Sequence, residues 1–339
     1  MKKEVIKGAL FEIFVLKLVL MSGYKLIDAS MVDGVRIRVL RKRFAEFKGR
    51  GEWHQIDIPV ELINQPPLIY PIRMLGEVKY KNRPVGKSSI RAEIGKMKDI
   101  QENYFADSSS PLPEQAKQDR RLEVFSFFSA SGFNDAAERL AYAHGIRTIS
   151  YQNNECIDGI AKTVDDIAEY LSKYPEFFQS IILDEIFDYL ISGKDFNDYS
   201  LLPMNDYQPF FESEIKTSII GTTASGLTIN FISYEDFPDE LFAEKDEAYC
   251  RIHSEDGERW YLTVNDSEVR FGFSMPEIVK SDFFDFDGIR IYPKKAFVFE
   301  TINFQRTIKG CQRSLTFKFD NEWFSNMGNF KTKNKDREQ

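Results

Sequence analysis

A strand–helix–strand pattern near the middle of the chain constrains the fold more than any other feature. The largely apolar segment Leu122–Phe128 is followed by Ser131-Gly-Phe-Asn-Asp, where a Ser or Asn side chain caps a helix predicted over Asp135–His144. A glycine ends this helix, and Ile146–Tyr151 is predicted to form a second strand. Two strands joined by a helical crossover of this length lie parallel in one sheet. The first part of the chain is therefore expected to be an α/β domain.

The residues before this unit supply a long first helix, three strands and a second helix. The first helix is predicted over Glu4–Met21 and ends at Ser22-Gly23. Its basic start and apolar stretch resemble a signal peptide. Glu12 and Lys17 interrupt the stretch, however, and no small-residue cleavage site follows, so we predict a buried or amphipathic helix and no membrane span. The other segments are strands over Val35–Leu40, Gln55–Val60 and Leu68–Tyr80, and a helix over Ile90–Tyr104.

The second half changes from helical to β-rich. Residues 163–191 have a helical pattern, and short alternating or aromatic runs separated by turns follow Gly221. Strands are predicted over Leu227–Ser233, Ala248–His253, Trp260–Val264, Val269–Phe273, Ile289–Tyr292, Ala296–Phe299 and Ser314–Phe319. We therefore expect an α/β domain over 1–155, a helical connector over 156–200, a β-rich α+β domain over 201–330 and a flexible polar tail over 331–339.

Charge is distributed unevenly between these parts. The whole chain of 339 residues has 45 Lys and Arg against 53 Asp and Glu, a net charge of −8, which on its face argues against a nucleic-acid partner. Residues 1–150, however, contain 25 basic and 18 acidic side chains, and the remainder contains 20 and 35. A basic first half is thus joined to an acidic second half. The three cysteines, Cys156, Cys250 and Cys311, form no disulfide or metal pattern, which favours a reducing cytoplasm.

The residues that carry chemistry are Asp57, Glu77 and Lys79. In residues 55–60 the period of two places Ile56, Ile58 and Val60 on one strand face and Asp57 on the other, while Glu77 and Lys79 share a face of a second strand. If the strands are neighbours, two carboxylates and an ammonium converge. Mg²⁺ prefers carboxylate oxygens, water and phosphate as ligands, and it polarises phosphodiesters. Alternatively, these charged side chains are solvated and only pair with one another across the strands, which contributes little to stability.

The order of motifs carries a family resemblance. It runs through Gly8-Ala-Leu-Phe11-Glu12, Gly23-Tyr24, Gly49-Arg-Gly51, Asp57, Glu77-Val78-Lys79-Tyr80-Lys81, Phe127-Phe-Ser-Ala-Ser-Gly132-Phe133, Ala136-Ala137 and Ala143-His144-Gly145-Ile146. Residues 1–155 thereby resemble the Mrr-type branch of the PD-(D/E)xK restriction-endonuclease superfamily. One departure is that Asp57 is followed by Ile-Pro rather than preceded by Pro.

The resemblance implies a restriction-endonuclease-like fold, a mixed sheet flanked by helices, with metal-dependent hydrolysis of DNA. Asp57 and Glu77 would bind Mg²⁺ or Mn²⁺, and Lys79 would complete the site. Glu12 matches a first-helix Glu that often joins such sites; its alternative is a surface position on an amphipathic helix. Many relatives also carry a Gln after the Lys, for which Gln101 is a candidate.

Basic residues on both sides of the motif suggest a DNA-binding surface. Lysine and arginine side chains neutralise phosphates and bind with little regard to sequence. The candidates are Arg41, Lys42, Arg43, Lys48, Arg50, Lys81, Arg83 and Lys87. A solvated charged face is the alternative.

By analogy with the family, the setting is a prokaryotic restriction or antiphage-defence system. Cutting both strands of a duplex needs two active sites, which favours a homodimer or higher oligomer. The acidic domain could sense a signal, recognise the target, bind an associated protein such as an ATPase, or mimic DNA. Two other functions stay open: a catalytically inactive nucleic-acid-binding or regulatory subunit with a nuclease-like fold, and an RNA-directed nuclease.

Overall fold

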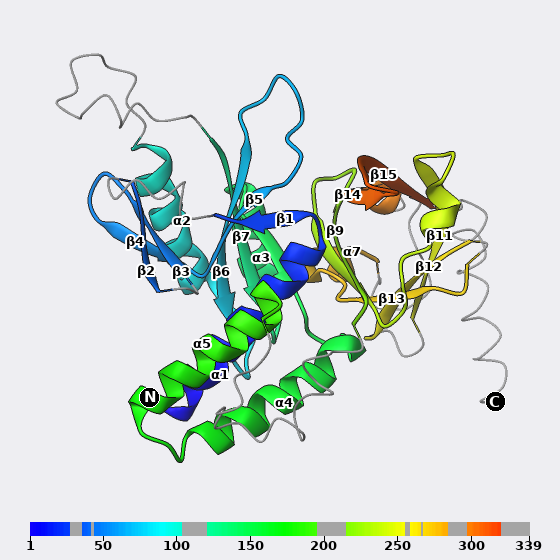
Figure 1. Cartoon of the computed structure of the whole chain (residues 1–339). Coiled ribbons are helices and arrows are strands. Elements are labelled where there is room, and N and C mark those ends of the chain that lie inside the picture. Colours follow the sequence, from blue (N-terminus) through cyan, green and yellow to red (C-terminus); the bar gives the residue numbers. More distant parts are fainter. Residues whose placement is uncertain are drawn as a thin grey trace, which may run out of the picture.

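The chain folds into a layered α/β region and a β-barrel (Figure 1). The computed structural model describes residues 1–27, 36–41, 44–103, 121–194, 215–254, 258–265, 267–283 and 297–319. The predicted strand over Ile289–Tyr292 and the predicted tail over 331–339 lie outside these residues. None of the described helices combines the length and the hydropathy that crossing a bilayer requires.

The central sheet of the α/β region is mixed, with the strand order β1-β5-β6-β7-β8. The first three strands are antiparallel, and β6, β7 and β8 run parallel to one another. Helices α2 and α3 make the two crossovers, so the predicted strand–helix–strand unit is confirmed. The bounds are β1 (Tyr24–Leu26), β5 (Ile58–Leu62), β6 (Ile72–Lys79), α2 (Lys87–Gln101), β7 (Leu122–Ser129), α3 (Asp135–Ala143) and β8 (Arg147–Ser150).

A small antiparallel sheet lies beside the central one. It consists of β2 (Ile37–Arg41), β3 (Phe44–Lys48) and β4 (Trp53–Ile56) in that order. The prediction of one strand over Gln55–Val60 is wrong, because β4 pairs with β3 while β5 pairs with β1 and β6. Consequently Ile56 and Ile58 do not share a face but belong to two different cores. Asp57 is the residue at which the chain passes from one sheet to the other.

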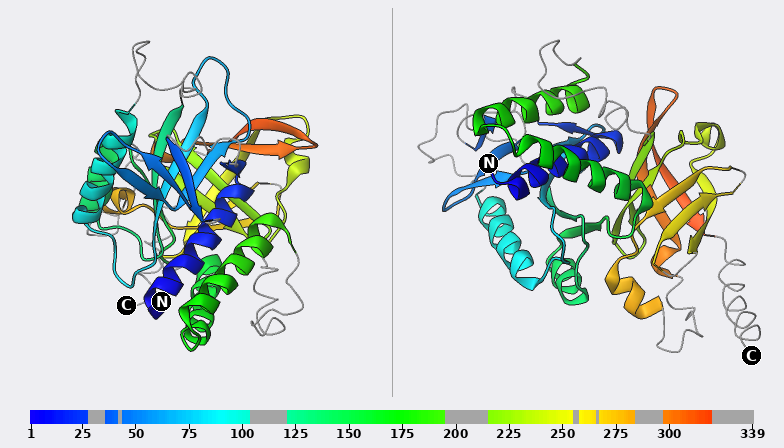
Figure 2. Two further views of the ribbon diagram at one scale, coloured as in Figure 1. Left: turned by 60° about the vertical axis from the view of Figure 1, so that its left-hand side comes forward. Right: turned by 90° about the horizontal axis from the view of Figure 1, so that it is seen from below.

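Helices cover both faces of the central sheet (Figure 2). One face buries Val60, Met74 and Val78 against three helices: α1 (Lys3–Met21), α4 (Glu155–Leu171) and α5 (Glu176–Ser192). The other face buries Leu75 and Phe127 against α2 and α3. The segment predicted as a connector therefore supplies two helices that share the core of α1, because their apolar sides need that burial.

The second half forms a closed barrel of seven strands in the order β10-β13-β12-β11-β15-β14-β9. Its core is rich in phenylalanine, with the tilted rings of Phe304 and Phe317 in contact at a ring-centroid distance of 4.6 Å. The strands are β9 (Thr217–Thr223), β10 (Thr228–Ser233), β11 (Glu247–Ser254), β12 (Trp260–Val264), β13 (Arg270–Phe273), β14 (Thr301–Ile308) and β15 (Cys311–Phe319). The sequence did not predict β9 or β14, and the predicted strand over Ala296–Phe299 is instead a 3-10 turn at Phe297–Phe299.

The barrel is joined to the α/β region through buried contacts. Ile232 of β10 belongs to the same core as α1 and α4. Beside it, the Tyr151 hydroxyl donates a hydrogen bond of 3.0 Å to Asn230 Oδ1. On another side, the Ile278 backbone N–H donates to the buried Glu138 carboxylate at 2.8 Å. These contacts place the acidic half directly against the domain that carries Asp57, Glu77 and Lys79.

The close approach of β5, β6 and β7 makes Gly76 a test of this arrangement. A Cβ atom at Gly76 would lie 2.7 Å from Ile58 Cβ and 3.0 Å from Phe128 Cε2. Gly76→Ala should therefore lower the free energy of unfolding by about 1–3 kcal/mol, measured by urea denaturation. The matched control is Gly159→Ala on α4, where no atom lies within 4 Å of the added Cβ; it should stabilise by roughly 0.5–1 kcal/mol. Equal effects from the two substitutions would contradict the strand packing.

Candidate active site

The site begins at the break between β4 and β5. The Asp57 backbone N–H donates to the Gly76 carbonyl at 3.1 Å, and Asp57 Oδ2 accepts a hydrogen bond of 3.0 Å from the Val78 backbone N–H. The Asp57 side chain thus takes the place of a strand carbonyl and continues the β5–β6 ladder by one step. Its second oxygen accepts a hydrogen bond of 3.3 Å from Gln55 Nε2. With 7% of its surface exposed, Asp57 is held rigidly beside β6.

Glu77 and Lys79 lie on the face of β6 that is covered by α2. Leu75, two residues earlier on the same strand, belongs to the core beneath α2 and α3. Glu77 Oε1 forms an ion pair with Lys79, and Glu77 Oε2 forms one of 2.5 Å with Lys96 of α2. Asp57 and Glu77 are close enough for each charge to disfavour the other. The structure thus brings together the three residues that the sequence singled out.

Two further charged residues, Glu93 and Lys96, complete the cluster. Glu93 was not identified from the sequence, and Lys96 was treated there only as one of the basic residues that follow the Glu77–Lys79 motif. Lys96 also forms an ion pair of 3.1 Å with Glu93 Oε2, one helical turn earlier. Glu93 is only 3% exposed, and within the described residues its Oε1 atom has no hydrogen-bond partner. The signal available in the sequence was their position on the apolar side of α2, among Ile90, Ile94 and Met97. A charged pair at helical spacing on a buried face is costly unless it has partners.

The surroundings of the three carboxylates shift their pKa values in different directions. Burial, reinforced by the charge of Glu77, raises the pKa of Asp57 to about 6. Burial also disfavours the charged form of Glu77, but Lys96 and Lys79 outweigh it and hold the pKa of Glu77 below its usual value. Burial raises the pKa of Glu93, with a smaller contribution from Glu77. Burial acts against both ammonium groups, yet nearby carboxylates outweigh it: Glu77 with Asp57 raises the pKa of Lys79, and Glu77 with Glu93 raises the pKa of Lys96.

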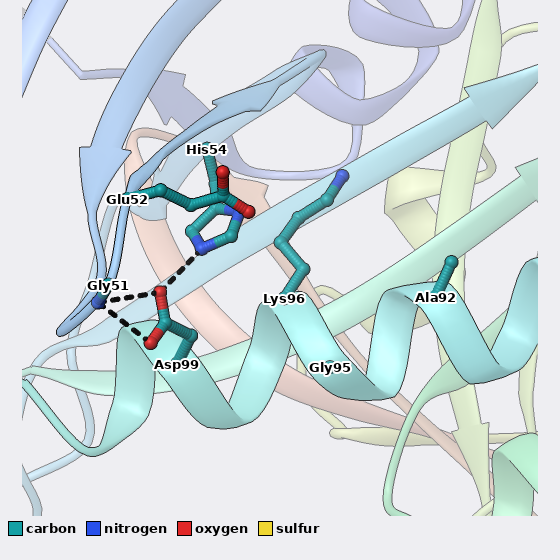
Figure 3. Close-up of a pocket in the computed structure, with 7 residues that line it drawn as sticks. All are labelled: Gly51, Glu52, His54, Ala92, Gly95, Lys96 and Asp99. Carbon is teal, nitrogen blue, oxygen red and sulfur yellow. Dashed lines mark hydrogen bonds and ion pairs between the residues drawn. The ribbon is translucent and has the colours of Figure 1, made fainter.

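A cleft of about 580 Å³ opens beside this cluster (Figure 3). Lys96 lies on its α2 side, and His54 of β4 lies next to the turn that joins β3 to β4. Asp99 of α2 holds that turn: it accepts a hydrogen bond of 3.1 Å from the Gly51 backbone N–H and contacts His54 Nε2 at 2.7 Å. The close fit requires glycine at position 49, since a Cβ there would lie 1.9 Å from Asp99 Oδ2. The remaining lining residues are Glu52, Ala92 and Gly95.

The first-helix candidate Glu12 is placed differently from the other three. It is half-buried on α1, and α1 packs on the face of the central sheet opposite to α2. Within the described residues, no three Asp, Glu, His or Cys side chains are arranged to hold a metal together. A metal-binding role of Glu12 therefore stays a prediction. Gln101 has a structural contact, because its Nε2 atom donates to the Glu123 carbonyl at 3.2 Å.

The proposed DNA-contact residues fall into three groups. Lys42 and Arg43 lie outside the described residues, and of Arg41 only the backbone is described. Near the β3–β4 turn, Lys48 lies over the Trp53 ring at 5.6 Å and Arg50 pairs with Glu102 at 2.6 Å. The other three follow β6 and are exposed on the surface: Lys81, Arg83 and Lys87.

The donor set suits one hard divalent cation. Asp57 and Glu77 lie close enough for the charge of Glu77 to raise the pKa of Asp57, and Mg²⁺ commonly takes one or two carboxylates and completes its shell with water and phosphate oxygens. Such a site does not require a third protein carboxylate. The oxygens of Glu77 are both engaged by lysine, so a cation must replace at least one ammonium group.

Comparison with known proteins leaves the family of this chain open. No protein-family model and no curated protein matches it. Among solved structures, it is similar to the crystal structure of the protein of unknown function AF1548 at 13% identity and a TM-score of 0.28. The alignment covers 55% of this chain and 99% of that one. A likeness at this TM-score carries no argument about fold or function.

The raised pKa of Asp57 makes stability depend on pH. The group has a pKa of about 6 in the fold against an ordinary value of 3.8, so its favourable contribution is complete below about pH 4 and is lost as pH rises through about 6. Asp57→Asn, which stays neutral and keeps an acceptor for Val78, should exceed the wild type in free energy of unfolding at pH 8 by about 3 kcal/mol. The gain should vanish at pH 4, as measured by urea denaturation with a chelator present. A gain independent of pH would contradict the assigned cause.

Proposed function

We propose that this protein is a metal-dependent endonuclease that hydrolyses DNA phosphodiester bonds at the Asp57, Glu77 and Lys79 cluster. The observation that carries the proposal is the convergence of these three side chains, from the junction of β4 and β5 and from β6, beside an open cleft that Lys96 lines. A mixed sheet with helices on both faces is also the arrangement that the resemblance to the Mrr-type PD-(D/E)xK nucleases implies.

Each residue has a role that follows from its contacts. Asp57, fixed by the Val78 N–H, and Glu77, kept ionised by its lysines, would hold Mg²⁺ or Mn²⁺. The bound ion supplies polarisation of the phosphate and a more acidic water. Lys79, whose raised pKa keeps it protonated, donates a hydrogen bond to a non-bridging phosphate oxygen and offsets charge as water adds to phosphorus and the ester oxygen leaves.

The exposed basic residues after β6 support nucleic-acid binding next to the cluster. Lys81, Arg83 and Lys87 are exposed, and their charges would pair with phosphates along the substrate strand. The barrel belongs to the acidic half, so we propose that it restrains the nuclease, recognises the target or binds an associated protein such as an ATPase. A prokaryotic defence setting and a homodimer or higher oligomer complete the proposal.

One observation favours a second candidate function. Both oxygens of Glu77 are paired with lysine, and the described residues form no three-carboxylate cage. A nuclease-like domain that binds nucleic acid without cutting it would have the same features. The two functions differ in what happens to the substrate.

The test is a digestion of duplex DNA, single-stranded DNA and RNA by the full chain with Mg²⁺ or Mn²⁺. Duplex DNA should be cut, and Asp57→Asn, Glu77→Gln and Lys79→Met should each lower the rate by about 10²–10³-fold. The first two remove the charge of a metal ligand, and the third removes the positive charge at the reacting phosphate. The matched controls are Asp236→Asn and Lys216→Met, from an exposed ion pair near the barrel, which should retain the wild-type rate.

Three outcomes would overturn this proposal. Binding of all three nucleic acids without any cleavage would establish the inactive binding domain. Cleavage of RNA alone would establish an RNA-directed nuclease. Cleavage that survives all three substitutions would place the active site elsewhere.

A further inference from the structure

Lys96 is shared between two carboxylates, the partly buried Glu77 and the buried Glu93. Its Nζ atom lies 2.5 Å from Glu77 Oε2 and 3.1 Å from Glu93 Oε2. Glu93 is more deeply buried than either of its neighbours in the ion-pair chain, and its Oε1 atom has no hydrogen-bond partner in the described residues. A buried oxygen without a partner is destabilising, and more so when it is charged, so this atom calls for an explanation.

A divalent cation on Glu77 requires one of two lysines to move. Lys79 occupies Oε1 and Lys96 occupies Oε2. Within the described residues the ion pair of Lys79 is with Glu77 only, so a Lys79 that left Glu77 would lose its carboxylate partner. Lys96 already contacts Glu93 and can leave Glu77 while it keeps a carboxylate partner. The lysine that yields is therefore Lys96.

We propose that Lys96 is an exchangeable counter-ion: it neutralises Glu77 in the absence of metal and transfers to Glu93 when a divalent cation binds. This inference rests on the proposed function, because it takes Asp57 and Glu77 as the metal ligands. Glu93 is then a positioning residue whose unpartnered Oε1 provides the second acceptor for the displaced ammonium. Since Lys96 also lines the cleft, the transfer changes the charge presented there at the moment the metal arrives.

The exchange predicts that Lys96 competes with the metal and that Glu93 relieves the competition. The experiment is calorimetric titration of Mn²⁺ into the full-length protein without nucleic acid. Lys96→Met should tighten Mn²⁺ binding by roughly tenfold, and Glu93→Gln should weaken it by a similar factor. In the Lys96→Met background, Glu93→Gln should have no effect, because no ammonium remains to be received.

A through-space effect of charge would behave differently. Glu52→Gln removes one carboxylate from the same cleft without touching Lys96, so its effect on Mn²⁺ affinity measures the charge contribution alone. Glu93→Asp keeps the charge and shortens the side chain by one methylene, and it should weaken Mn²⁺ binding nearly as much as Glu93→Gln. Glu93→Asp therefore still tests the exchange if Lys96→Met fails to fold.

The outcomes separate this inference from the proposed function. Three results would overturn the exchange and leave the proposed nuclease function standing. They are unchanged or weaker Mn²⁺ binding by Lys96→Met, equal effects of Glu93→Gln in both backgrounds, and wild-type affinity in Glu93→Asp. The predicted coupling in a protein that cuts no nucleic acid would support the exchange and overturn the nuclease. A wild-type protein that binds no Mn²⁺ would overturn both.

Discussion

The hydrogen bond from the Val78 N–H to the Asp57 carboxylate is the interaction on which the site depends. It is made where the chain leaves the small sheet and enters the central one, at the single residue between β4 and β5. Because the carboxylate continues the β5–β6 ladder, Asp57 is fixed beside Glu77 by backbone geometry rather than by a flexible side chain. The close fit of Gly76 against Ile58 holds the two strands at the spacing that this bond needs.

The burial that results makes the charges interdependent. Two carboxylates at close range disfavour each other's ionised forms, and the lysines of β6 and α2 reverse this for Glu77 but not for Asp57. The cluster therefore contains one carboxylate that is firmly ionised and one whose ionisation is costly in the absence of a cation. A divalent ion would supply the nearby positive charge that stabilises ionised Asp57. Metal binding, lysine exchange and hydrolysis would then depend on one set of contacts.

Much of this region could be predicted from the sequence, for identifiable reasons. Periodicity and turn residues gave the β7–α3–β8 unit and the long α1, and motif order pointed to Asp57, Glu77 and Lys79. The break at Asp57 was not predictable, because apolar residues on both sides of it continue a strand pattern although they enter different cores. Glu93 and Lys96 were hidden for a related reason: their role depends on which face of α2 meets β6. For Glu12, the sequence could not reveal that α1 covers the other face.

Whether Asp57 and Glu77 bind one metal ion together can be seen in a crystal structure of the protein with Mn²⁺, located by its anomalous scattering. We expect a single peak about 2.1 Å from a carboxylate oxygen of each residue, with the Lys96 ammonium on Glu93 rather than on Glu77. A Mn²⁺ ion bound elsewhere, or a Glu77 carboxylate that keeps both lysines at saturating Mn²⁺, would contradict this expectation.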